Sequence, residues 1–111
     1  MARNRNQERK VSILVRIPSE IVHARHEEFC DTVREHVEYY MDGPELFIIP
    51  FNYEHLSNYR FSLVFPDKAP EDAADRLEKV VRLSIAEMKI GLLEEEKEAR
   101  MKQLRTRHSG L

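Results

Sequence analysis

The chain has 111 residues, of which 41% are hydrophobic and 34% are charged, and its formal net charge is −2. This length allows one domain with a hydrophobic core, and no apolar run approaches the roughly 20 residues that a membrane-spanning helix needs. A short alternating segment, rather than an apolar one, follows the charged N-terminus, so we expect no signal peptide. The single cysteine, Cys30, permits no intramolecular disulfide. These features together predict a cytoplasmic protein.

The small net charge conceals a separation of charges along the chain. Residues 1–10 carry four basic and one acidic side chain, residues 97–111 carry five basic and one acidic, and residues 11–96 have a net charge of −9. Two explanations stay open: solubility together with helix-dipole complementarity, or contact of the basic ends with an anionic partner. That partner would be nucleic acid or the acidic body of a second subunit. The candidate nucleic-acid contacts are Arg3, Arg5, Arg9, Lys10, Arg105 and Arg107.

The N-terminal part of the chain predicts a basic arm, a strand and a helix. Residues 1–9 are polar without periodicity, which is typical of a disordered arm. Residues 10–17 alternate between apolar and polar side chains as a half-buried strand does, and Pro18 ends the alternation. Ser19 then begins a helix of about 22 residues, which Gly43 and Pro44 terminate. Its predicted apolar face consists of Val22, His26, Phe29, Cys30, Val33, Val37 and Tyr40.

The opening of the chain, VSILVRIPSEI, resembles the start of a ribbon-helix-helix repressor. That family requires a break after a short first helix, whereas the helical pattern here continues for about 22 residues. The resemblance therefore implies no function for this chain.

Two further segments are rich in residues that favour strands. Leu46–Phe51 is a short apolar run, and Tyr59–Phe65 alternates in period two. Seven residues separate them, so we expect a short loop instead of a tight hairpin. Pro50 cannot donate a backbone hydrogen bond and predicts that its strand lies at a sheet edge or a bulge.

The last third of the chain predicts one long helix, from Pro70 to about Arg107, with two opposed apolar faces. The first face contains Leu77, Val80, Val81, Ser84, Met88, Gly91 and Leu92 and fades after Leu92. The second contains Leu83, Ala86, Ile90, Leu93, Met101 and Leu104. At 1.5 Å per residue, about 35 helical residues span roughly 50 Å, which exceeds the diameter of about 35 Å of a compact chain of this size. The end of the helix must therefore project, and we assign the second face to a partner.

The order strand, helix, strand, strand, helix predicts an α+β fold. A right-handed crossover leaves a gap between the first two strands, which the third strand fills antiparallel to both. The predicted architecture is a split βαβ sheet of order 1-3-2, ferredoxin-like but lacking the fourth strand, with both helices on one face. Residues 10–95 form the domain, and residues 96–111 form the projecting basic end of the C-terminal helix and the tail.

Two clusters of side chains invite a chemical interpretation. His23, His26, Glu27 and Cys30 have spacings that permit metal binding or a thiol nucleophile on the first helix, but His26 and Cys30 fall in its apolar stripe. A second cluster, Tyr53, His55 and Tyr59 followed by Arg60, could stack on bases. We predict that all these side chains are structural, with no cofactor and no metal site.

These patterns lead to one leading function and two alternatives. We expect a non-enzymatic interaction module, such as an accessory, adaptor or inhibitor protein, that acts as a homodimer and binds an unknown protein partner. The predicted dimer interface is Leu83, Ala86, Ile90, Leu93, Met101 and Leu104. One alternative is a small protein that binds nucleic acid weakly through its basic ends. The other is a metal-binding protein or thiol enzyme that uses His23, His26, Glu27 and Cys30.

Overall fold

The structure of the protein, a computed structural model, describes residues 9–53 and 56–109, and the side chains of residues 51–53, 56–57 and 105–109 lie outside that description. The element order is strand, helix, strand, strand, helix, as predicted. The elements are β1 (Lys10–Arg16), α2 (Ser19–Tyr40), β2 (Glu45–Tyr53), β3 (Leu56–Val64) and α3 (Ala73–Ser109).

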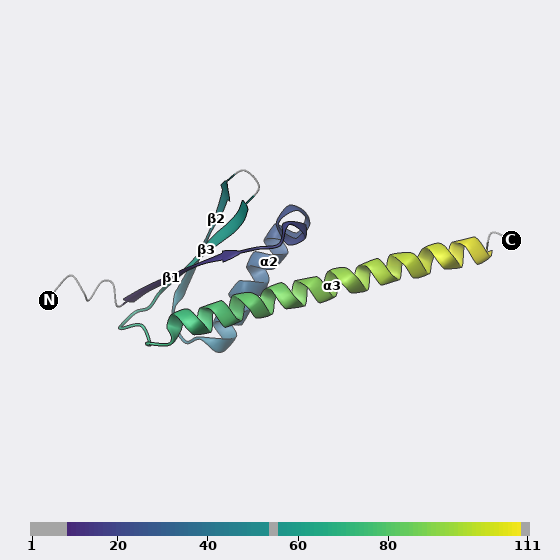
Figure 1. The fold of residues 1–111 in the computed structure, drawn as a ribbon. Helices are drawn as coiled ribbons and strands as arrows, with labels where there is room; N and C mark the ends of the chain where they lie inside the picture. Colours follow the sequence, from purple (N-terminus) through teal and green to yellow (C-terminus); the bar gives the residue numbers. More distant parts are fainter. Residues whose placement is uncertain (1–8, 54–55, 110–111) are drawn as a thin grey trace.

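The three strands form one sheet in the order β1-β3-β2, which confirms the predicted topology. Both outer strands pair antiparallel with β3, for example Ile13 with Phe61 and Ile48 with Phe61. Both helices cover the same face of the sheet (Figure 1). Strand β3 is central, so its inward side chains are enclosed by strands on both sides and by the helices above.

The core lies between this face of the sheet and the two helices. Its fully buried side chains come from α2, β3 and α3: Ile21, Phe29, Val33, Phe61, Leu63, Leu77 and Val81. The Phe29 and Phe61 rings meet edge to face, with centroids 6.2 Å apart at an interplanar angle of 83°. Because burying each such side chain contributes about 1.5–3 kcal/mol, this cluster holds the two layers together.

Helix α2 bends near its start. Its backbone is helical except at Arg25, where φ is −139° and ψ is 28°. The bend shifts the first turns relative to the remainder, so Ile21 is buried while His26 is exposed. His26 was predicted in the apolar face, and its ring does lie against that face, because its Nδ1 bonds the Tyr59 hydroxyl group and its Nε2 lies 3.9 Å from Cys30 Sγ, although the residue as a whole is exposed. Tyr40 is also exposed, and Met41 is buried in its place beyond the helix end. Gly43, with φ of 86°, turns the chain toward β2.

The connection between β2 and β3 is shorter than predicted. The two strands stay paired through Asn52 with Ser57 and Tyr53 with Leu56, which leaves only residues 54–55 between them. The expected loop over 52–58 was therefore wrong, because continued pairing satisfies the backbone groups of these residues. Pro50 does lie in an edge strand, as its missing N–H requires.

Helix α3 begins at Ala73, three residues after Pro70. A turn precedes it, in which the Ala73 N–H donates to the Pro70 carbonyl oxygen at 3.0 Å, and the helical bonding then starts at the carbonyl of Asp72. The 37 residues of α3 span about 55 Å. The longest dimension of the molecule is 78 Å. Its radius of gyration is 18.7 Å, whereas a compact chain of this length has a radius of gyration of about 13 Å. The end of the helix therefore projects from the body (Figure 1).

The inner face of α3 matches the prediction. Leu77, Val81 and Ser84 are fully buried, Val80 is nearly so, and Met88 and Leu92 lie at the margin of the core. Ser84 fits there because its hydroxyl donates to the Val80 carbonyl oxygen at 2.9 Å. From Leu93 to Leu104 every side chain of the helix is exposed. The body of the protein thus covers α3 only over its first half.

Candidate interaction surfaces

The outer face of α3 carries an exposed apolar stripe, here called the outer stripe: Leu83, Ala86, Ile90, Leu93, Met101 and Leu104. The exposed fractions of its larger side chains run from 38% at Leu83 to 57% at Leu93. These are the six residues that the sequence assigned to a dimer interface. The structure places them on one side of the helix, facing away from the core, and the dimer itself stays a prediction.

Polar contacts with α2 fix the direction in which the outer stripe faces. Arg25 binds Glu28 on its own helix and Glu95 on α3. Nearer the start of α3, the His36 ring nitrogen Nε2 lies 2.9 Å from a Glu87 carboxylate oxygen. Because these contacts lie on different turns of α3, they hold the helix against rotation about its axis. The outer stripe consequently keeps its orientation as far as Glu95.

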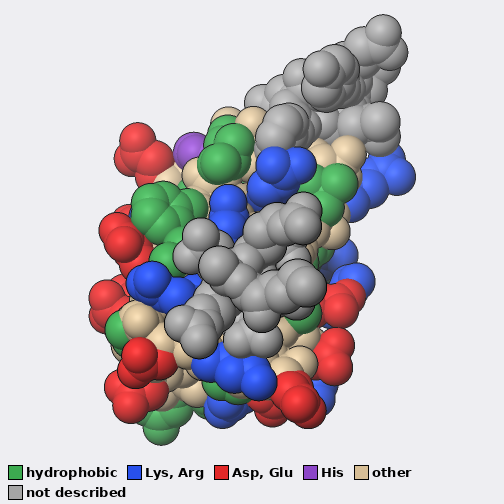
Figure 2. Space-filling model, turned by 90° about the vertical axis from the view of Figure 1, so that its left-hand side faces the viewer, with side chains coloured by type: hydrophobic (Ala, Val, Ile, Leu, Met, Phe, Trp, Pro, Cys, Tyr) green, Lys and Arg blue, Asp and Glu red, His purple; other side chains and the backbone are tan. Residues whose placement is uncertain are grey.

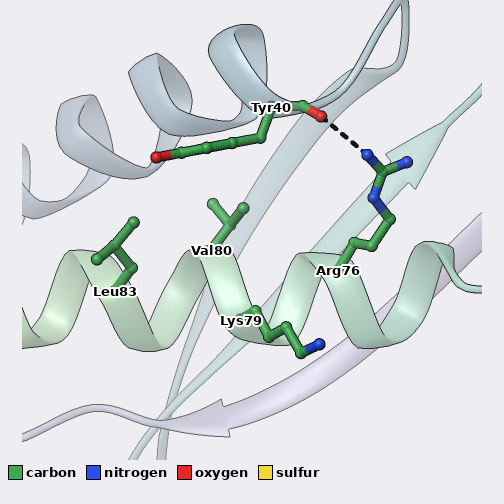
Figure 3. A pocket seen from close by; sticks show the side chains of 5 residues that line it. All are labelled: Tyr40, Arg76, Lys79, Val80 and Leu83. Carbon is green, nitrogen blue, oxygen red and sulfur yellow. Dashed lines mark hydrogen bonds between the residues drawn. The ribbon is translucent and has the colours of Figure 1, made fainter.

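A pocket opens at the start of the outer stripe, between the end of α2 and the first turns of α3. Its volume is about 320 Å³, and its lining residues are Tyr40, Arg76, Lys79, Val80 and Leu83. Figure 3 shows the Tyr40 side chain lying along α3 toward Leu83, with Val80 below it. Arg76 donates to the Tyr40 carbonyl oxygen at 3.4 Å, whereas Lys79 points away from α2 (Figure 3). Since Leu83 belongs to both, the pocket continues the outer stripe.

Tyr39 enlarges the apolar surface beside this pocket. Its ring meets the Tyr40 ring edge to face, with centroids 4.8 Å apart, and 80% of the residue is exposed. Exposed tyrosines of this kind are common at protein interfaces, because they combine apolar area with a hydroxyl group that tolerates water.

The second exposed apolar surface is the open face of the sheet, opposite the helices. Leu14, Phe47 and Ile49 point outward there and are 44–61% exposed. In the centre, the hydroxyl groups of Ser12 and Ser62 form a hydrogen bond of 2.8 Å across β1 and β3. The sequence pattern does not indicate this face in β2, because the continuous run LFIIPF does not show which of its residues face the core.

The charged side chains of the open face are mainly basic. Lys10, Arg16 and Arg60 occupy outward positions, with Glu45 as the acidic exception. Figure 2 views the end of the molecule opposite the projecting helix, where Lys and Arg side chains lie both near the middle and along the right-hand edge, and Asp and Glu mainly around the edge.

Among the described residues, the basic regions near the two ends of the chain lie far apart. The start of β1 and the end of α3 lie at opposite ends of the molecule (Figure 1). Arg9 is tied to the fold, because its Nε donates to the Phe65 carbonyl oxygen at 3.1 Å. Lys10 is exposed beside it. Among the other candidate nucleic-acid contacts, Arg3 and Arg5 and the side chains of Arg105 and Arg107 lie outside the description.

The His26 and Cys30 side chains of α2 have internal partners. His26 Nδ1 bonds the hydroxyl group of Tyr59, and His26 Nε2 lies 3.9 Å from Cys30 Sγ. His23 and Glu27 are exposed. Within the described residues, no three His, Cys, Asp or Glu side chains are grouped so that they could hold a metal ion.

The environment of Cys30 does not favour a reactive thiolate. Burial raises the pKa of the thiol, the charges of Asp31 and Glu27 raise it further, and only Arg34 opposes them. A hollow of about 250 Å³ between α2 and Ile48 reaches this group. Because the pKa is raised, the thiol stays protonated at neutral pH, and a catalytic cysteine needs the opposite shift.

The proposed base-stacking cluster is not assembled in the described residues. Tyr59 is buried in the core, and Arg60 points to the other side of the sheet because adjacent strand residues alternate. His55 and the side chain of Tyr53 lie outside the described part of the structure.

Comparisons with protein families, with curated proteins and with solved structures give no match to this chain. Neither described helix is apolar over a sufficient length to cross a membrane.

Proposed function

We propose that the protein is a non-enzymatic interaction module that acts as a homodimer, in which the outer stripes of two α3 helices pack together. The observation that carries the proposal is the outer stripe itself, which repeats at helical spacing along a helix that continues past its own domain. Solvated helices normally carry polar side chains on the face turned to water. A second copy of the chain would bury these apolar side chains.

The second copy also suits the charges of the chain. The body is acidic and the end of α3 is basic, so the basic end of each subunit can meet the acidic body of the other. In the projecting part of the helix, Arg100 forms an ion pair with Glu96 of the same helix, with 3.1 Å between the nitrogen and oxygen atoms.

The open face of the sheet is the surface that such a dimer would present to another protein. It lies on the side of the sheet away from both helices (Figure 1), so pairing along α3 would leave it accessible. Leu14, Phe47 and Ile49 supply apolar contact area, and three basic side chains against one acidic favour an acidic partner.

Replacement of both Ile90 and Leu93 by Glu tests the dimer. A two-fold interface loses four apolar side chains through this change. Full burial of each contributes about 1.5–3 kcal/mol, and these residues are already about half buried. The loss should therefore be at least about 3 kcal/mol, or more than a hundredfold in Kd. Light scattering should show the dimer mass for the natural chain and the monomer mass for the variant.

A matched control places the same change on the other apolar surface. The Leu14→Glu and Ile49→Glu variant also introduces two acidic side chains at exposed apolar positions, but on the sheet. We expect it to retain the dimer mass. If the natural chain is a monomer at high concentration, or if only the sheet variant becomes one, the proposal is wrong.

A further inference from the structure

We propose that the two α3 helices pair antiparallel, with the two-fold axis beside Leu93 and Glu94, so that the projecting end of each helix lies on the body of the other subunit. This inference rests on the homodimer proposed above and adds its direction and register. Three independent features of the chain support it: the symmetry of the outer stripe, the distribution of charge, and the position of the pocket beside Leu83.

The outer stripe is nearly symmetric about the point between residues 93 and 94. Leu83 and Leu104 are equally distant from that point, and so are Ala86 and Met101. Antiparallel pairing about this point sets Leu83 against Leu104 and Ala86 against Met101 of the second copy, and it brings Leu93 beside Glu94 at the two-fold axis. Lys97 then faces Ile90, where its hydrocarbon stem can cover the isoleucine while the ammonium group reaches water. Parallel pairing would instead set Lys97 against Lys97.

The charges favour the same direction. Residues 97–111 have a net charge of +4, whereas residues 35–42 and 67–82, which surround the start of α3, together carry eight acidic and four basic side chains. Antiparallel pairing brings the basic end of one chain to this acidic region of the other. Parallel pairing brings the two basic ends side by side, where they repel each other.

Parallel pairing would offer some attractive contacts, but they compete with existing ones. In register, it would place Arg82 near Glu87 of the second copy and Lys89 near Glu94. Arg82 already binds Glu78 at 2.9 Å, and Glu87 already lies 2.9 Å from His36. In the antiparallel register, Arg100 of the second copy lies opposite Glu87 and Arg105 lies opposite Arg82, so this pairing also brings charged residues to the same two contacts.

The pocket beside Leu83 provides the third argument. In the antiparallel register, Leu104 of the second copy arrives opposite Leu83, which lines the pocket. The volume of about 320 Å³ is ample for a leucine side chain, and Val80 and the Tyr40 ring supply apolar walls (Figure 3). In a parallel pair Leu104 would lie some 30 Å away along the helix, at 1.5 Å per residue. The antiparallel pair thus explains both the pocket and the far end of the outer stripe.

Disulfide trapping in a Cys30→Ala background distinguishes the two directions. One chain carries Leu83→Cys, and the other carries Leu104→Cys and a tag that changes its mobility in a gel. Because disulfides require Cα atoms within about 7 Å of each other, antiparallel pairing should give mainly the mixed cross-link after oxidation. Parallel pairing should give Leu83→Cys homodimers from that chain alone. Light scattering of each reduced variant confirms that it is still a dimer, and the pair Ala86→Cys with Met101→Cys checks the register at a second position.

Each outcome has a definite meaning. Mixed cross-links at both positions support the antiparallel pair. Cross-linked homodimers of Leu83→Cys overturn it and leave the proposed homodimer standing. A dimer mass without any cross-link shows that another surface pairs, which overturns the inference, and a monomer mass for the natural chain overturns the homodimer as well.

Salt provides a second measurement that needs no substitution. Attraction between a basic end and an acidic region weakens when salt screens it, whereas repulsion between two basic ends is relieved. We expect the dimer Kd to rise several-fold between 50 mM and 500 mM NaCl. A Kd that falls over this range would contradict antiparallel pairing.

Discussion

The two apolar faces of α3 contain the same kinds of residue in opposite surroundings. Leu77 and Val81 on the inner face are fully buried, whereas Ile90 and Leu93 on the outer face are more than half exposed. Both faces repeat at helical spacing, so spacing does not separate them. The difference arises because the sheet and α2 cover one side of the helix only. Periodicity therefore identifies an apolar face of a helix. Only the rest of the structure shows whether the same chain covers that face.

Truncation of one residue on each face should give the largest difference in stability between the two faces. Leu77→Ala leaves a cavity in the core and should lower the free energy of unfolding by about 2–5 kcal/mol. Leu93→Ala should change it by no more than about 0.5 kcal/mol at protein concentrations low enough to give monomers. Urea unfolding of both variants measures the difference. Equal losses would mean that the outer face is packed within the monomer.

Enlargement of a small residue on each face tests the same difference by adding atoms instead of removing them. Ser84→Leu forces extra atoms into a site that is fully buried and should cost about 1–3 kcal/mol of stability. Ala86→Leu adds apolar area to the exposed outer stripe and should leave monomer stability nearly unchanged. Thermal unfolding of dilute protein compares the two variants. A loss at Ala86 as large as that at Ser84 would contradict the assignment of the faces.

The smallest expected effect concerns alkaline pH and involves the core alone. Burial raises the pKa of Cys30 above its ordinary value of 9.0 and that of Tyr59 above 10.0, and the Cys30 charge raises the latter further. The folded protein therefore retains these protons at a pH where the unfolded chain has lost them. Stability from this source is complete below pH 9 and falls as the pH rises beyond it.

Unfolding measured from pH 8 to 11 tests this effect. The Cys30→Ala variant should show a weaker decline above pH 9, whereas Leu93→Ala, on the outer stripe, should decline as the natural chain does. Stability that rises over this range would show that the sign is wrong.

The sequence predicted most of the fold because its strongest signals are local. Alternation in β1 and β3, the helical spacing in α3 and the chirality of crossover connections are together sufficient for the strand order β1-β3-β2. The buried residues of α3 followed from the same spacing. The inner face of α3 includes Ser84, which is polar, because a serine in a helix can bond the carbonyl group four residues earlier.

The incorrect predictions arose where tertiary structure overrides a local pattern. His26 is exposed at the margin of the apolar face although its ring bonds Tyr59, and no breaker such as proline marks the bend of α2 at Arg25 in the sequence. The β2–β3 hairpin is longer than predicted because pairing extends through polar residues that resemble a loop. The exposure of Phe47 and Ile49 could not be predicted, since a continuous apolar run gives no indication of which side faces the core.

The strand order also determines when the sheet can be completed as the chain is synthesised. Strand β1 is made first, but it pairs only with β3. Arg16 pairs with Asn58, which lies 42 positions later in the chain, and Lys10 pairs with Val64, which lies 54 positions later. Strands β2 and β3 are neighbours in the chain and can pair as soon as both have emerged. The nascent chain therefore holds an unpaired apolar strand until most of the domain has been made, and during that interval β1 is the segment most exposed to misdirected pairing with other chains.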